Sequence, residues 1–295
     1  FWKRAWVLSN RRREGIMSES SKANGSTKLT WCGLTDVGRF RKNNEDAFLA
    51  LTFNAEEVRY LGKIGDANFD GSDYIFAVSD GMGGAKAGEF ASKIAVDKIA
   101  ELLPKTFNLG AMGLDRGCSQ ILSELVNRIH CQMVEMGTHY EECRGMGATL
   151  SLCWFTPGRM YFAHVGDSRI YYFPRDGEMQ QITEDHTHVA RLVKNGRISA
   201  FEARTRPDRN ILEQALGGNV RRVDPQIGSV EYEVGDRFVL CTDGVTDGIS
   251  NRRIQALTAF PPANFADLNY AERLVVDAKQ ESGRDNLTAL AVEIS

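Results

Sequence analysis

Several signatures of common protein classes are missing from this sequence. It has no apolar stretch close to the roughly 18–20 residues that a membrane span requires. It also has no Gly-x-Ser-x-Gly pattern of a serine hydrolase and no Gly-Lys-Ser/Thr ending of a nucleotide-binding loop. The formal charge of −3 gives no electrostatic reason to expect a nucleic acid partner. These absences argue against a membrane-spanning protein, a serine hydrolase, a nucleotide-binding protein and a nucleic-acid-binding protein.

The cysteines form no recognisable framework. None of the six belongs to a Cys-x-x-Cys pair, and Cys153 and Cys241 lie inside apolar runs, where a free thiol behaves as a small hydrophobic group. A disulfide framework is not expected in a chain of 295 residues without a secretory signal. We therefore expect a reducing, cytoplasmic location.

The first residues differ from the rest of the chain. Residues 1–16 contain five basic residues and one acidic residue, which gives them a net charge of +4. Because the whole chain has a formal charge of −3, the remainder carries −7. Residues 18–27 are small and polar, as in disordered segments. We interpret 1–28 as a leader or disordered tail, with Met17 as a candidate native start, and 29–295 as a single domain.

Apolar runs alternate with turn signals along that domain. We expect strands at 29–36, 45–53, 74–80, 147–155, 159–165, 169–174, 237–243 and 287–294. We expect helices at about 87–103 (ended by Pro104), 114–136, 188–195, 251–258 and 266–281. Residues 54–72 read as an inserted loop and 197–210 as a mobile, Arg-rich surface segment. Strands on both sides of a helical block predict an α+β layered sandwich of two sheets, mainly antiparallel, covered by helices.

Four acidic turns stand at the ends of apolar runs. They contain Asp80, Asp167, Asp243 and Asp285. A carboxylate near a low-dielectric core is unstable unless its charge is compensated. If these aspartates converge, hard divalent cations with oxygen ligands are the usual partners.

Local alternatives remain open for each turn. Gly81 permits close backbone approach and offers its carbonyl as a metal ligand, but Asp80 could also be an ordinary helix cap. Arg41 could clamp a phosphate while Glu45 and Asp46 face a metal or its waters, or the loop could be simply solvated.

Two further patterns are weaker. Asp247 follows Asp243 by four residues, so both could face one cation, or Asp247 could cap the following segment. Gly283–Asn286 resembles a plain turn. We read His186 and His188 as a polar turn and helix start rather than as a transition-metal pair.

Taken together and in order, these motifs resemble the PPM/PP2C family of metal-dependent protein serine/threonine phosphatases, in its bacterial form. The resemblance covers about residues 31–293. The matching segments are Asp36 to Asp46, Asp80 to Gly84, Gly147 to Thr149, Gly166 to Arg169, Thr183 to His186, Gly196 to Ile198, Asn210 to Gly217, Thr242 to Gly244 and Arg284 to Asn286.

The resemblance implies an αββα sandwich with two Mn²⁺ or Mg²⁺ ions and a weaker third. It implies that Asp80 bridges the two metals, that the Gly81 carbonyl ligates one of them, and that Asp243 and Asp285 hold the other. Asp167 and Asp247 match the positions of the third ion. An all-oxygen ligand set favours Mg²⁺ or Mn²⁺ over zinc.

The resemblance also implies roles in catalysis. Asp46, with Glu45 behind it, orients a metal-bound water that attacks phosphorus in line, and Arg41 binds the phosphate. Met82 stands where eukaryotic members carry a histidine proposed as general acid, so we expect a metal-bound water to protonate the leaving group. Residues 197–210 match the family's flap, and we use that name for them below.

The implied activity is hydrolysis of phosphoserine and phosphothreonine in proteins. The expected partners are phosphorylated proteins and a cognate Hanks-type kinase, with no nucleic acid, no membrane span and a monomeric state. Two alternatives remain: a non-catalytic regulatory domain of the same fold, and a phosphohydrolase of small phosphorylated molecules.

Overall fold

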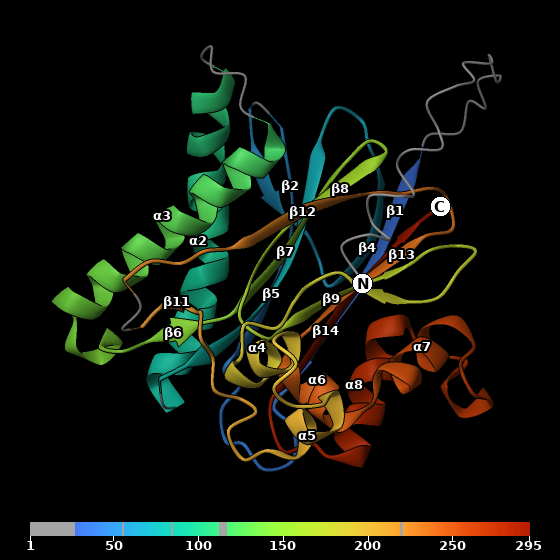
Figure 1. Ribbon diagram of the computed structural model, residues 1–295. Coiled ribbons are helices and arrows are strands. Elements are labelled where there is room, and N and C mark those ends of the chain that lie inside the picture. The colour runs from blue at the N-terminus through green and yellow to red at the C-terminus, as the bar shows by residue number, and fades with distance from the viewer. Residues whose placement is uncertain (1–26, 55, 84, 112–116, 219–220) are drawn as a thin grey trace.

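The computed structural model describes residues 27–54, 56–83, 85–111, 117–218 and 221–295. Two antiparallel sheets pack face to face between two layers of helices (Figure 1). This confirms the predicted α+β, four-layer αββα sandwich. The predictions for residues 1–26 lie outside the described residues, and the division into a leader and a single domain stays a prediction.

The first sheet has six strands in the order β10-β9-β13-β14-β1-β4. Their bounds are Gln180–Gln181, Arg169–Phe173, Arg237–Cys241, Leu287–Ile294, Lys28–Asp36 and Ile64–Asn68.

The second sheet has eight strands, with the path β11-β6-β5-β7-β8-β12 and with β2 and β3 beside β5. The path strands are Leu216–Gly217, Gly147–Ala148, Asp73–Met82, Leu150–Thr156, Arg159–Val165 and Gln226–Glu231, and the two at the side are Asp46–Phe53 and Val58–Tyr60.

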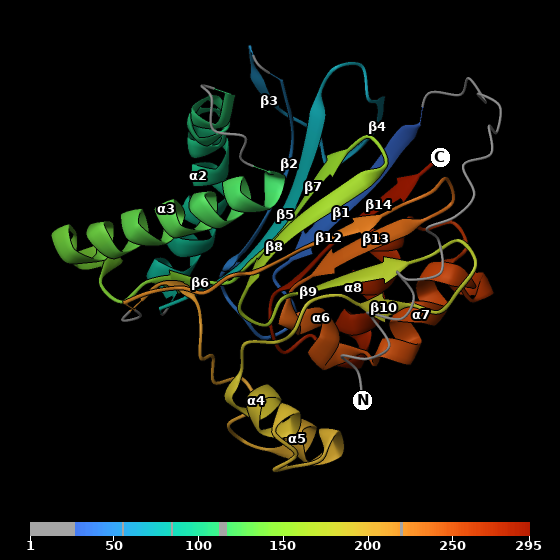
Figure 2. The same cartoon turned by 45° about the horizontal axis from the view of Figure 1, so that its top comes forward.

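Helices cover the outer face of each sheet. Helices α2 (Ala85–Ala111) and α3 (Cys118–His139) pack on the second sheet, and α6 (Asp243–Gly248), α7 (Asn251–Ala259) and α8 (Tyr270–Glu281) lie on the side of the first. Two short helices, α4 (His188–Lys194) and α5 (Ala200–Thr205), project from the sandwich (Figure 2). Within the described residues, no helix combines the length and apolar character needed to cross a membrane.

The central strands are buried on both faces, which explains their continuous apolar runs. On β5, Tyr74, Phe76 and Val78 pack into the core between the sheets. Ile75 and Ala77 alternate with them and pack under α2 and α3. Successive side chains therefore stabilise different layers of the sandwich.

Two sequence predictions about the elements were wrong, and strand β12 was not predicted. Helix α2 continues through Pro104 to Ala111, because a proline removes one backbone donor from the helix without necessarily ending it. Residues 54–72 are not only a loop, since β3 pairs with β2 and β4 pairs with β1. Strand β12 was missed because its residues are mostly half-buried and carry no continuous apolar run.

Candidate active site

The strand register brings two predicted site carboxylates face to face. Asp46 begins β2, and Asp80 lies near the end of β5, directly opposite it in the antiparallel pairing. Like charges at paired positions destabilise a sheet. This pairing therefore requires compensation from elsewhere.

The other strand-end aspartates reach the same edge from neighbouring elements. Asp243 starts α6 directly after β13, and Asp285 precedes the adjacent strand β14. Asp167 lies between β8 and β9. We call this group the acidic cluster: Asp46, Asp80, Asp167, Asp243 and Asp285.

Burial and mutual repulsion raise the pKa values within the acidic cluster. Burial is the largest cause for Asp80, whose pKa lies well above its ordinary value, and the other four members raise it further. Burial likewise raises the pKa of Asp46 to about 7 and that of Asp243 to about 6. The cluster is therefore a place where positive charge would be strongly stabilised.

Asp46 also leaves one oxygen without a partner. Its Oδ2 accepts a hydrogen bond from the Thr242 hydroxyl at 2.7 Å, whereas its Oδ1 is buried without a hydrogen-bond partner. A buried carboxylate oxygen without a hydrogen-bond partner is energetically costly, which favours binding of a cation or a water molecule to it.

Asn286 holds the loop that carries the predicted phosphate-binding arginine. Its side-chain amide donates to the carbonyls of Val37 and Asn43, both at 2.9 Å, and its Oδ1 accepts from the Glu45 N–H at 2.8 Å. The Glu45 carbonyl in turn accepts from the Gly81 N–H at 3.0 Å. The loop is thereby tied to both sheets.

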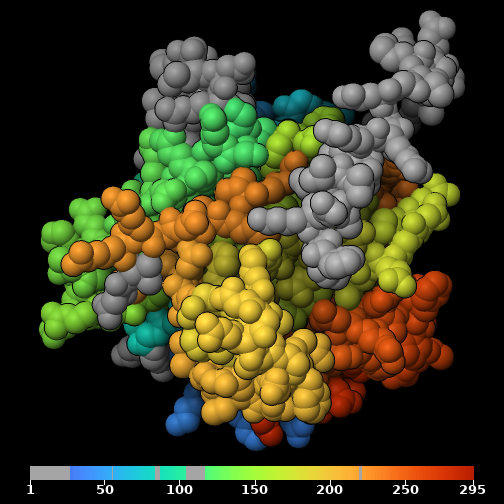
Figure 3. Space-filling view, in the orientation of Figure 1, coloured from blue at the N-terminus to red at the C-terminus, as the bar shows by residue number. Residues whose placement is uncertain are grey.

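Two of the predicted ligands hold arginines. Asp285 pairs with Arg41 at 2.7 Å, and Asp247 pairs with Arg209 of the flap at 2.8 Å. Across the described parts of the chain, no three Asp, Glu, His or Cys side chains already stand as a closed metal site. In the space-filling view the flap region, coloured yellow to gold, forms a raised block beside the C-terminal helices (Figure 3).

Glycines allow the close packing behind Asp80. A Cβ on Gly81 would lie 1.9 Å from the carbonyl oxygen of Gly88 on α2, and a Cβ on Gly88 would lie 2.9 Å from the Glu45 carboxyl group. The Glu45 carboxyl group thus packs against α2. Gly81 has no room for a side chain, whereas at Gly88 the Glu45 carboxyl group would have to move.

Threonines of the quoted motifs have roles that the sequence reasoning missed. Thr149 accepts a hydrogen bond from the Asp80 N–H at 2.9 Å and bonds Ser168 at 2.7 Å. Thr242 bonds Asp46. Both threonines belong to quoted motif segments, Gly147-Ala148-Thr149 and Thr242-Asp243-Gly244. Membership in these motifs was the sequence feature from which a role at the site could have been predicted.

His186 and His188 bind separate partners rather than one shared site. His186 accepts a hydrogen bond from the Gly166 N–H at 3.2 Å, while the His188 ring lies 3.2 Å from Glu213. The interpretation as a turn and helix start agrees with this arrangement, since α4 begins at His188 with Thr187 as its cap.

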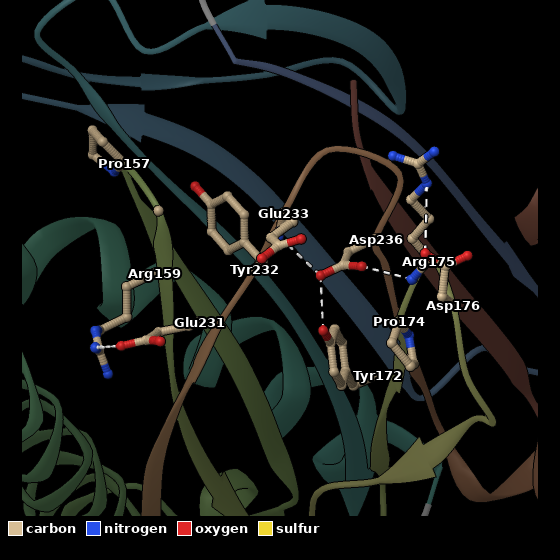
Figure 4. Close-up of a pocket in the computed structure, with 11 residues that line it drawn as sticks. Pro157, Arg159, Tyr172, Pro174, Arg175, Asp176, Glu231, Tyr232, Glu233 and Asp236 are labelled. Atoms are coloured by element: carbon tan, nitrogen blue, oxygen red, sulfur yellow. Dashed lines mark hydrogen bonds and ion pairs between the residues drawn. The ribbon is translucent and has the colours of Figure 1, made fainter. Parts of the chain in front are cut away.

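A surface hollow of about 640 Å³ lies at the opposite strand ends, where β8 begins, β9 ends and β13 begins (Figure 4). Its buried carboxylate, Asp236, is fully occupied: it accepts from the Tyr172 hydroxyl and from the N–H groups of Arg175 and Glu233. These bonds make Asp236 a support for the turn rather than a reactive group.

Comparison with known proteins agrees with the fold and the motifs. Residues 64–280 match the family described as Protein phosphatase 2C. The chain is 31% identical over 269 residues to the serine/threonine protein phosphatase PstP of Mycobacterium tuberculosis, covering 90% of this chain and 45% of PstP. It is also 31% identical over 263 residues to the protein phosphatase PhpP of Streptococcus pneumoniae, covering 89% of this chain and 96% of PhpP.

Solved structures show the same similarity. The catalytic domain of PstP in complex with two manganese ions matches with a TM-score of 0.69 and 30% identity, covering 91% of this chain and 99% of that one. The phosphatase Stp1 of Staphylococcus aureus matches with a TM-score of 0.74 and 27% identity, covering 95% and 100%.

These relatives and solved structures are serine/threonine protein phosphatases of bacteria. The chain belongs to the protein phosphatase 2C family. The predicted family is confirmed. The chain spans less than half the length of PstP.

Proposed function

We propose that this chain removes phosphate from phosphoserine and phosphothreonine in proteins, with two Mn²⁺ or Mg²⁺ ions held by the acidic cluster. The convergence of buried carboxylates with raised pKa values carries this proposal. The unpartnered Asp46 Oδ1 supports it, because a cation or its water would satisfy that oxygen. An all-oxygen donor set suits these two metals.

The proposed ligands divide between the two sheets. Asp80 and the Gly81 carbonyl come from the second sheet, while Asp243 and Asp285 come from the side of the first. When bound, the ions supply Lewis acidity toward water and the phosphoryl oxygens. A weaker third ion at Asp167 and Asp247 is part of the proposal, and it would have to displace Arg209 from Asp247.

The chain's own residues position the reactants. Asp46 holds the attacking water through its free oxygen, and Glu45 keeps the Gly81 backbone in place through its carbonyl. Arg41 has 46% of its side chain exposed, so it is accessible to a phosphate and can exchange its bond to Asp285 for one to the substrate. Met82 has no proton to donate, so water is proposed as the acid for the leaving group.

The test uses the metal-stripped chain with a phosphothreonine peptide. We expect turnover to return on adding Mn²⁺, to disappear with EDTA, and to be nearly lost in Asp80→Asn. Asp66→Asn, which alters a surface ion pair with Lys28, is the matched control and should keep its activity. Full turnover in the presence of EDTA would refute the metal mechanism.

Two outcomes would favour the alternative functions. Binding of Mn²⁺ without turnover of any phosphoester would indicate a regulatory domain. Faster turnover of free phosphoserine than of phosphopeptides would indicate a small-molecule phosphohydrolase. A cognate Hanks-type kinase, a cytoplasmic location and a monomeric state stay predictions.

A further inference from the structure

Thr242 joins the two halves of the acidic cluster. It follows β13 in the first sheet and is completely buried. Its Oγ1 lies 2.7 Å from Oδ2 of Asp46, which belongs to the second sheet. Most contacts between the sheets are apolar, and apolar contacts do not fix the orientation of a group. This hydrogen bond is directional and therefore orients the Asp46 carboxyl group.

The direction of the hydroxyl proton follows from its other partner. The Thr288 N–H donates to the same Oγ1 at 3.0 Å, so the oxygen is already an acceptor there. The single hydroxyl proton is therefore available for Asp46, and Thr242 acts toward it as a donor. The bond therefore fixes the orientation of the Asp46 carboxyl group.

The backbone of Asp46 is held by the same network. The Asp46 N–H donates to Asn44 Oδ1 at 3.2 Å, and the Asn44 amide donates to the Thr35 hydroxyl at 2.8 Å. Thr35 also accepts from the Thr288 hydroxyl at 2.8 Å. The side chain of Asp46 is therefore held by Thr242, and its backbone is held through Asn44 by Thr35 of β1, in the first sheet.

We propose that Thr242 is a positioning residue for the metal site. Its hydroxyl holds Oδ2 of Asp46 and leaves Oδ1 as the oxygen available to a cation or to the attacking water. The first sheet thereby aligns a carboxylate of the second sheet with Asp243. This inference rests on the proposed metal-dependent function.

A purely structural role is the competing explanation, because Thr242 also satisfies the Thr288 N–H. Thr183 provides a matched control. It is a buried threonine whose hydroxyl oxygen accepts the Ile170 N–H at 3.1 Å, whereas the side chain of Asp46 bonds to Thr242. Thr183→Val therefore removes a backbone acceptor, as Thr242→Val does, without touching Asp46.

The experiment measures Mn²⁺ binding to the metal-free chain by titration calorimetry, with thermal unfolding to monitor the fold. We expect Thr242→Val to weaken Mn²⁺ binding about 10–100-fold, as substitutions behind metal ligands commonly do. Thr242→Ser, which keeps the hydroxyl, should stay within about threefold of the wild type. Thr183→Val should lower the melting temperature yet leave Mn²⁺ affinity unchanged.

A double variant tests whether Thr242 acts through Asp46. In an Asp46→Asn background, Thr242→Val should cost little further affinity, because the partner is already altered. If Thr242→Val does not fold, Thr242→Cys, a similar-sized and much weaker donor, should show the same direction of change. Wild-type Mn²⁺ affinity in a folded Thr242→Val or Thr242→Cys variant would overturn the inference while leaving the proposed function intact. No Mn²⁺ binding by the wild type would overturn both.

Discussion

Replacing Asp46 with asparagine should stabilise the metal-free protein although it damages the proposed site. The pKa of Asp46 rises from 3.8 to about 7 on folding, chiefly through burial. A tenfold change in proton affinity corresponds to about 1.4 kcal/mol, so ionising Asp46 costs about 4 kcal/mol more in the folded protein than in the unfolded chain. Asparagine has the same shape and no such cost.

The sign of the pH dependence follows from the raised pKa. The stability contributed by protonated Asp46 is complete below pH 3.8 and is lost as the pH rises through about 7. The variant's advantage should therefore be smaller at pH 5 than at pH 8. We expect about 1–3 kcal/mol at pH 8, less than the full cost because protons on neighbouring acids relieve part of the repulsion.

The assay is urea unfolding of both chains at pH 5 and pH 8, with and without Mn²⁺. Saturating Mn²⁺ should reverse the order, since a ligand at about 100 times its dissociation constant adds about 2.7 kcal/mol to the protein that binds it. Asp236→Asn is the matched control, because Asp236 is buried but fully hydrogen-bonded, and its replacement should destabilise the protein at both pH values. If metal-free Asp46→Asn is less stable than the wild type at pH 8, the electrostatic reasoning is wrong.

Two further predictions follow from single contacts. Gly81→Ala should destabilise the protein by about 2 kcal/mol or more and reduce Mn²⁺ binding, because its Cβ would lie 1.9 Å from the Gly88 carbonyl oxygen. Gly117→Ala, which meets nothing within 4 Å, is its control in unfolding and calorimetry, and equal behaviour of the two would contradict the packing argument. Arg209→Gln should strengthen binding of a weaker third Mn²⁺ a few-fold, because it frees Asp247 from a partly exposed ion pair. Arg206→Gln, whose arginine pairs with Asp208 instead, should leave that binding unchanged, and calorimetric curves that match for the two variants would refute this role of Arg209.

Much of the fold was predictable because burial leaves a local trace in the sequence. Continuous apolar runs identified the strands buried on both faces, such as β5 and β14, and a stop at Gly196 identified the end of α4. Edge elements were harder to predict. Strands β4 and β12 gain their hydrogen bonds from strands that are distant in the sequence, β1 and β8, and β3 is only three residues long. The residues of all three show little periodicity.

The sequence by itself determined the chemical character of the site: which residue types are present, their order, and the strand ends at which they stand. Only the tertiary structure decided which groups meet. Asp46 faces Asp80 through strand register, Thr242 reaches Asp46 across the two sheets, and Arg41 turns to Asp285. The reason is physical, since residue type is a local property of the chain. A partner 196 or 244 positions away is selected only when the packed layers fix the distance between them.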